Sequence, residues 1–120
     1  MQVTRIYADE SGESHFEDIE VNVSPVDFAP PAPPLHISPA VASAQMLFAS
    51  LPRGWFGDWH PAPRRQYWVG LRGAVEVTVS DGASRRFGPG SVVLLEDVSG
   101  KGHVTRVVDE HDAQGMFVQL

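Results

Sequence analysis

Hydrophobic and polar residues alternate most clearly in the second half of the chain. Residues 75–80 read Val-Glu-Val-Thr-Val-Ser, and a period of two residues is typical of an antiparallel strand with one buried face. Asp81-Gly82 follows, and this dipeptide favours a hairpin turn of the primed type. A partner strand is therefore expected at Ala83–Phe87, before Gly88-Pro89-Gly90 breaks the chain.

Similar short apolar or alternating segments recur along the rest of the chain, separated by turn-forming residues. Further strands are expected at His15–Val23, Ala44–Leu51, Gln66–Arg72, Ser91–Glu96, His103–Val108 and Gly115–Leu120. No window shows a sustained 3.6-residue apolar period with caps at both ends, so little helix is expected. Many short strands at this spacing indicate a sandwich, a jelly roll or a barrel.

Proline is concentrated in one segment near the N-terminus. Six of the ten prolines lie between Pro25 and Pro39. Because proline cannot donate a backbone hydrogen bond and fixes its own φ, this segment is expected to run extended over the surface as an arm. Only 24 residues precede Pro25, too few for a separate domain.

Composition narrows the class of protein further. The 120 residues carry a formal net charge of −6, and residues 1–27 hold seven carboxylates against one base, Arg5. Such a chain lacks the concentrated basic face of a nucleic-acid binder. The absence of cysteine excludes disulfides, thiolate metal sites and cysteine nucleophiles. No apolar run is long enough for a membrane helix and no secretory signal is visible, so a cytoplasmic protein with no membrane partner is expected.

Two spaced sets of glycine and histidine carry the candidate chemistry. In the first, five residues separate Gly54 from His60, and six residues separate Gln66 from Gly73. In the second, five residues separate Gly90 from Glu96, and two residues separate Gly100 from His103.

This arrangement, over residues 54–108, resembles the two motifs of the small single-domain cupins, the RmlC-like jelly-roll family. It departs from them where Ala62 replaces a histidine, Gln66 replaces a glutamate and Glu96 replaces a proline. The resemblance implies an all-β, antiparallel jelly-roll barrel formed by one domain, residues 1–120. Residues 1–43 would supply N-terminal strands and the Pro-rich arm, and residues 44–120 the barrel core. It also implies a homodimer, in which the arm either stays on its own protomer or is exchanged.

If His60 points into the barrel, strand alternation places Gln66 on the same face, and both can meet His103 there. Two imidazoles and an amide oxygen would hold a divalent transition metal such as Fe, Mn, Ni or Zn, more weakly than a set containing glutamate. Glu96 or Asp97 could replace the missing carboxylate. In the alternative interpretation, the histidines are hydrogen-bonded core residues and the glutamine pairs with a neighbour.

Aromatic and cationic residues close to the first motif are candidates for ligand contacts. A pocket for a planar molecule could have a wall formed by Trp59, Tyr67 and Trp68. Alternatively, these side chains fill the barrel interior or are buried in a dimer contact. Arg64 or Arg65 could clamp a carboxylate or phosphate.

The sequence thus favours a cupin that binds a small organic acid or an aromatic, polyketide-like ligand. In the first interpretation it is a metal-assisted isomerase, lyase or cyclase, or a dioxygenase if the metal is redox-active, with His60 and His103 as catalytic groups. The alternatives are a metal-free binding or sensing protein, and a metal-free epimerase or isomerase with a histidine base. The loop Ser99-Gly100-Lys101-Gly102 lacks the spacing of a phosphate-binding loop, so nucleotide binding is not expected.

Overall fold

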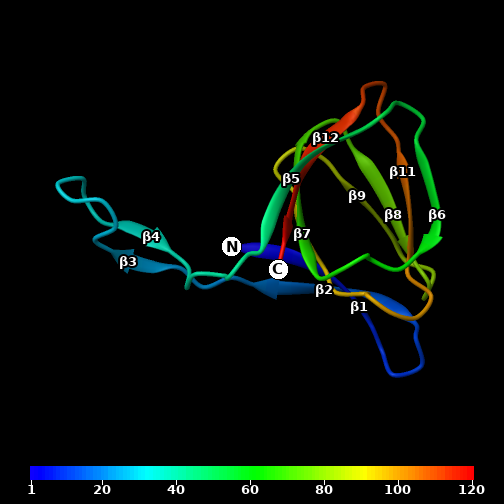
Figure 1. Cartoon of the computed structure of the whole chain (residues 1–120), viewed down its shortest axis with the longest axis horizontal. Helices are drawn as coiled ribbons and strands as arrows, with labels where there is room; N and C mark the ends of the chain where they lie inside the picture. Colours follow the sequence, from blue (N-terminus) through cyan, green and yellow to red (C-terminus); the bar gives the residue numbers. More distant parts are fainter.

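A computed structural model describes all 120 residues as twelve strands with no helix (Figure 1). The strands are β1 (Gln2–Ala8), β2 (Ser14–Glu20), β3 (Ser24–Val26), β4 (Leu35–Ile37), β5 (Gln45–Leu51), β6 (Phe56–His60), β7 (Gln66–Arg72), β8 (Val75–Val79), β9 (Ser84–Phe87), β10 (Val92–Leu95), β11 (His103–Val107) and β12 (Ala113–Gln119). The expectation of an all-β chain is confirmed. None of its segments forms a helix that could cross a membrane.

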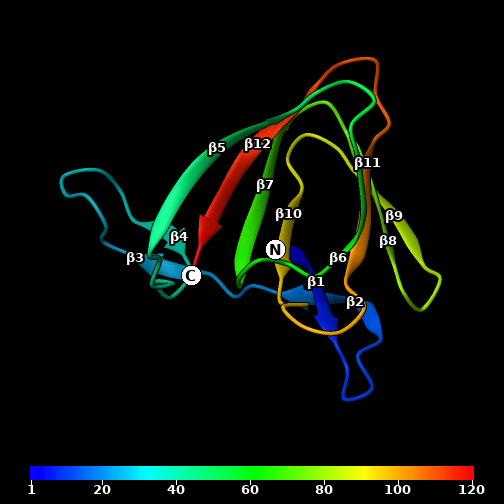
Figure 2. The same ribbon diagram turned by 45° about the vertical axis from the view of Figure 1, so that its right-hand side comes forward.

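Two sheets face each other and enclose the interior (Figure 2). One sheet has six strands in the order β2-β1-β10-β7-β12-β5, and the other has four in the order β6-β11-β8-β9. Val75, Val77 and Val79 of β8 are all buried, which confirms the alternation read from the sequence. They pack in one core with Trp68 of β7 and with Ile6 of β1, which is fully buried.

N-terminal strands were expected within residues 1–43, but no range was predicted for β1, which lies inside the six-stranded sheet. It pairs antiparallel with β2 and parallel with β10. Its buried residues Val3 and Ile6 are three positions apart, so the strand lacks the period of two that marks a half-buried strand. The barrel therefore draws on residue 3 and residue 6 as well as on residues 44–120.

The β8–β9 hairpin turns by a different geometry from the one expected. Both primed turn types require a positive φ at the first central residue, which here is Asp81, but no residue other than glycine has a positive φ. Instead, Gly82 N donates to Val79 O, Val79 N donates to Ala83 O, and Gly82 has a φ of +98°. This is the pattern of a three-residue loop in which glycine takes the left-handed position after an ordinary turn.

The Pro-rich arm forms a small hairpin of β3 and β4 that projects from the barrel (Figure 1). This hairpin points away from the barrel instead of running over its surface. Phe28 is 66% exposed, and Val26 and Leu35 are also exposed. The arm thus presents apolar side chains to its surroundings.

A histidine outside both motifs joins two turns at the surface. His15 on β2 makes ring-nitrogen contacts of 2.7 Å to Asp9 and 2.8 Å to Asp81. Its pKa is raised, first by the hydrogen bond to Asp9 and then by the one to Asp81. When the imidazole carries a proton, this cluster stabilises the contact between the β1–β2 turn and the β8–β9 turn.

Candidate functional site

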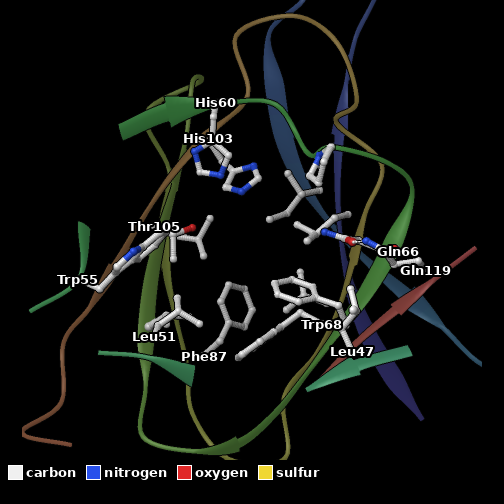
Figure 3. Close-up of a pocket in the computed structure, with 17 residues that line it drawn as sticks. Leu47, Leu51, Trp55, His60, Gln66, Trp68, Phe87, His103, Thr105 and Gln119 are labelled. Atoms are coloured by element: carbon white, nitrogen blue, oxygen red, sulfur yellow. Dashed lines mark hydrogen bonds between the residues drawn. The ribbon is translucent and has the colours of Figure 1, made fainter. Parts of the chain in front are cut away.

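The barrel encloses a cavity of about 320 Å³ (Figure 3). Most of its lining is apolar, and none of it is an acidic or basic side chain other than histidine. The lining residues are Ile6, Leu47, Leu51, Trp55, His60, Pro63, Gln66, Trp68, Val75, Val77, Phe87, Val93, Leu95, His103, Thr105, Phe117 and Gln119. A cavity of this size and lining is suited to one small molecule.

The structure brings the two motif histidines together. His60 ends β6 and His103 begins β11, and the two positions are directly paired in the sheet. Their ring centroids are 4.6 Å apart at an interplanar angle of 57°. Gly102 makes this approach possible, because a Cβ at that position would lie 2.1 Å from the carbonyl oxygen of His60. The glycines of the 97–102 loop therefore position His103, as the sequence suggested.

Hydrogen bonds at the outer edge of each ring fix which nitrogen faces the cavity. Nδ1 of His60 lies 2.6 Å from the carbonyl oxygen of Asp58, and a carbonyl can only accept, so this nitrogen donates. Nδ1 of His103 lies 2.6 Å from Oδ2 of Asp97 and donates to that carboxylate. Neither Nε2 has a hydrogen-bond partner in the protein, so the neutral pair presents two acceptors to the cavity.

Asp97 is fully buried directly behind His103. Its side chain is 0% exposed, and Oδ1 is the one buried side-chain polar atom of the protein without a hydrogen-bond partner. The sequence suggests Asp97 as a replacement for the missing metal-binding carboxylate. In the structure its carboxylate instead contacts Nδ1 of His103, on the side of the ring away from the cavity-facing Nε2.

Glu96 has a different role from the one considered for it. Its carboxylate accepts hydrogen bonds from Arg5 Nε (2.6 Å) and from Arg65 Nε, and it does not line the cavity. Burial raises the pKa of Glu96, but the hydrogen bonds from Arg65 and Arg5 outweigh that effect, so its pKa is lowered overall. Glu96 and Arg65 are therefore a surface ion cluster and not parts of the site.

Gln66 lies in the cavity wall, buried at 3% exposure, but its oxygen is already engaged. Oε1 of Gln66 accepts a hydrogen bond of 2.8 Å from Nε2 of Gln119 on the neighbouring strand β12. Figure 3 shows this amide pair on a different wall of the cavity from the two imidazoles. Gln119 was not singled out in the sequence, because its contact depends on the pairing of β12 with β7.

Three expected ligand contacts lie outside the cavity. The guanidinium of Arg64 donates to the backbone oxygen of Leu120 at 2.9 Å. Trp59 is 50% exposed, and Tyr67 faces the opposite side of β7 from Gln66 and Trp68. The alternation assumed from His60 through Arg64 fails because residues 61–65 form a loop between β6 and β7.

Trp68 lines the cavity as expected, and Trp55 takes the place proposed for Trp59. The indole of Trp55 lies across Gly57, where a Cβ would approach the ring to 2.5 Å. Trp68 stacks at a tilt on Phe117, with centroids 4.9 Å apart. The cavity thus has aromatic side chains on its walls.

The donor set fits a metal ion incompletely. Two imidazole nitrogens are free to coordinate, but no group of three or more histidine, cysteine, aspartate or glutamate side chains is positioned to hold an ion. The third expected ligand, Gln66 Oε1, accepts from Gln119. No carboxylate faces the cavity, so the charge that normally strengthens a divalent site is missing.

The fold and cavity define a cupin-like jelly roll. The chain is similar to the cupin domain of Schizosaccharomyces pombe Cnp3, with a TM-score of 0.52 and 11% sequence identity over 99% of this chain and 88% of that domain. It is also similar to the conserved SPY1581 protein of unknown function from Streptococcus pyogenes, with a TM-score of 0.44 and 20% identity over 63% of this chain and 75% of that one. No protein-family model matches the sequence, and no curated protein matches it.

Proposed function

We propose that the barrel binds a small, uncharged and largely apolar molecule, and that the imidazoles of His60 and His103 exchange a proton with it. The observation that carries this proposal is the pairing of an apolar cavity with two imidazoles whose Nε2 atoms have no protein partner. Of the two ligand classes expected from the sequence, it favours the aromatic, polyketide-like one over the organic acid.

The preference for an uncharged ligand follows from the cavity wall. No lysine or arginine lines it, and Arg64, the expected anion clamp, is bound to Leu120 O. A carboxylate entering this space would lose its hydration without gaining a cation in return. A flat ring would instead pack against Trp55 and Trp68.

Asp97 makes His103 the better placed base. When Nε2 of His103 accepts a proton from a ligand O–H or an acidic C–H, the resulting imidazolium lies 2.6 Å from a buried carboxylate. That carboxylate stabilises the positive ring and keeps Nδ1 protonated in the neutral state. Returning the proton to another atom of the ligand completes an isomerisation, with no net loss or gain of atoms.

A panel of bicyclic probes tests this function. In ligand-observed NMR titrations we expect 2-tetralone to bind and 2-naphthoate to bind at least about 10-fold more weakly, because the carboxylate is not paired. In D₂O, the α-protons of 2-tetralone should exchange faster in the presence of the wild-type protein than in the presence of a His103→Ala variant. Equal binding of the neutral and anionic probes, or no binding of either at millimolar concentration, would contradict the proposal. Binding without faster exchange would leave a binding or sensing protein without catalysis.

A metal-assisted reaction is the second candidate. It is favoured by the hydrogen bonds from both Nδ1 atoms to fixed oxygens, the pattern that orients metal-binding histidines. His60 and His103 would hold the ion, which would act as a Lewis acid on a ligand oxygen. Elemental analysis of untagged protein after incubation with Fe, Mn, Ni or Zn tests it. A His103→Ala variant that retains the same metal content would reject this site.

A further inference from the structure

A ladder of three glutamines runs across three neighbouring strands of the six-stranded sheet and ends in the cavity. Gln45 on β5, Gln119 on β12 and Gln66 on β7 are directly opposite one another in the register of neighbouring strands. Nε2 of Gln45 donates to Oε1 of Gln119, and Nε2 of Gln119 donates to Oε1 of Gln66 at 2.8 Å. The direction of donation is the same at both steps.

The NH₂ group of Gln66, at the inner end of this ladder, has no hydrogen-bond partner in the protein. Gln66 receives a hydrogen bond at its oxygen, and no hydrogen bond is made by its Nε2. The side chain is 3% exposed and lines the cavity. Nε2 is not sealed in the core, since Asp97 Oδ1 is the one buried side-chain atom that lacks both a partner and accessible surface. The N–H donors of Gln66 are therefore available to the cavity.

The two polar regions of the cavity are complementary in hydrogen bonding. The imidazoles of His60 and His103 present acceptors, because each Nδ1 donor is used outside the cavity. Gln66 presents donors on another wall (Figure 3). A ligand that satisfies both carries a donor at one position and an acceptor at another, with an apolar ring system between them.

We propose that the Gln45–Gln119–Gln66 ladder is a recognition site for a carbonyl oxygen of the ligand. This inference rests on the proposed function and names its ligand class as a neutral, ring-containing hydroxy-carbonyl compound. The position occupied by a metal-binding glutamate in the family motif is then an amide donor. The same N–H stabilises the carbonyl oxygen as negative charge develops there during removal of a neighbouring proton by the imidazole pair.

The proposal is tested with three neutral probes of the same size: 2-tetralone, which carries the carbonyl, 5,6,7,8-tetrahydro-2-naphthol, which carries a hydroxyl, and tetralin, which carries neither. We expect the wild-type protein to bind 2-tetralone about 3- to 10-fold more tightly than tetralin, the range for one neutral hydrogen bond. Gln66→Met should remove this difference and leave the affinity for tetralin within about 2-fold.

A second variant keeps the test independent of folding. Gln66→Glu retains an oxygen to accept the Gln119 hydrogen bond and replaces the cavity-facing N–H with an oxygen. It should lose the preference for 2-tetralone and favour the hydroxyl probe. Gln114→Met, which changes an exposed glutamine of β12 outside the ladder, serves as the control and should behave as the wild type does.

Two contrary results are distinguishable. If the probes bind and both Gln66 variants keep the wild-type preference for 2-tetralone, the ladder is overturned and the cavity remains a binding site. If no probe binds to the folded wild-type protein at millimolar concentration, the ladder and the proposed function are both overturned.

Discussion

Replacing Asp97 with leucine removes the partner of the Nδ1–H of His103 from a place that water does not reach. The two side chains are 0% and 6% exposed, and the hydrogen bond between them is 2.6 Å. Asp97→Asn keeps a side-chain oxygen that can accept from the imidazole and removes only the charge. The two variants therefore separate the hydrogen bond from the carboxylate charge.

The magnitude follows from the groups left without partners. Losing a hydrogen bond to an ionised acceptor costs about 1.5–3 kcal/mol, and leaving the N–H unpaired adds about 1–3 kcal/mol. Removing the unpartnered Oδ1 of Asp97 offsets about 1–3 kcal/mol of this. We expect Asp97→Leu to lower the free energy of unfolding by about 2 kcal/mol, which is roughly 6–10 °C in Tm. Asp97→Asn should stay within about 1 kcal/mol of the wild type.

Urea unfolding measures the free energy, and ¹⁵N NMR of the imidazole reports the tautomer. In the wild type the proton should reside on Nδ1 of His103, and in Asp97→Leu the ring should populate both tautomers. A wild-type ring with its proton on Nε2 would refute the assignment of acceptors in the cavity. So would a leucine variant as stable as the wild type with an unchanged tautomer.

Three further predictions concern the fold around the site. His15→Gln should destabilise the protein at pH 5.5, and the destabilisation should shrink as the pH rises. Because the pKa of His15 is raised in the folded state, its contribution to stability is fully present below about pH 6.5 and is lost above the folded-state pKa. Thermal unfolding from pH 5.5 to 9 checks this, and a difference in Tm that does not depend on pH would contradict it. Gly102→Ala should lower the free energy of unfolding by more than about 3 kcal/mol, because φ is +73° and the Cβ would meet the backbone of His60. Gly82→Ala, where φ is +98° and the surroundings are open, should lower it by about 1–2 kcal/mol. Comparable losses in urea unfolding would argue against the close approach at Gly102. The expected homodimer is tested by light scattering, in which Phe28→Glu should shift the mass toward the monomer if the exposed arm lies in the interface; a monomeric wild type would reject it.

The parts of the fold that were predictable are those in which one residue in two is buried. The sequence pattern predicted that the β8 valines are buried and that Gln66 and Trp68 of β7 share one face, and both predictions are confirmed. Strand β1 lacks this pattern, because Val3 and Ile6 are separated by two residues, and its place is decided by the parallel pairing with β10. Glycine positions were readable where they allow a loop to bend, as at Gly102.

The site was predictable in its histidines and less so in their partners. The motif spacing identified His60 and His103, which lie together in the cavity. The roles of Asp97 and Gln119 depend on contacts across the sheet and the 97–102 loop, which no local pattern encodes. Arg64 was misplaced because a period of two was carried through a loop containing Pro61 and Pro63. Trp59 was proposed because it lies next to His60 in the sequence, but neighbouring residues of a strand point to opposite faces.

Strands β5 and β6 follow one another in the chain, yet each forms the free edge of a different sheet. Leu47 of β5 and Trp55, which directly precedes β6, line the cavity while remaining 45% and 38% exposed. Passage through this side needs rotation of side chains and no rupture of backbone hydrogen bonds, and exposed side chains rotate within nanoseconds. A ligand should therefore associate and dissociate quickly. Its residence time would be set by the contacts that it makes inside the cavity and not by a slow conformational change of the backbone.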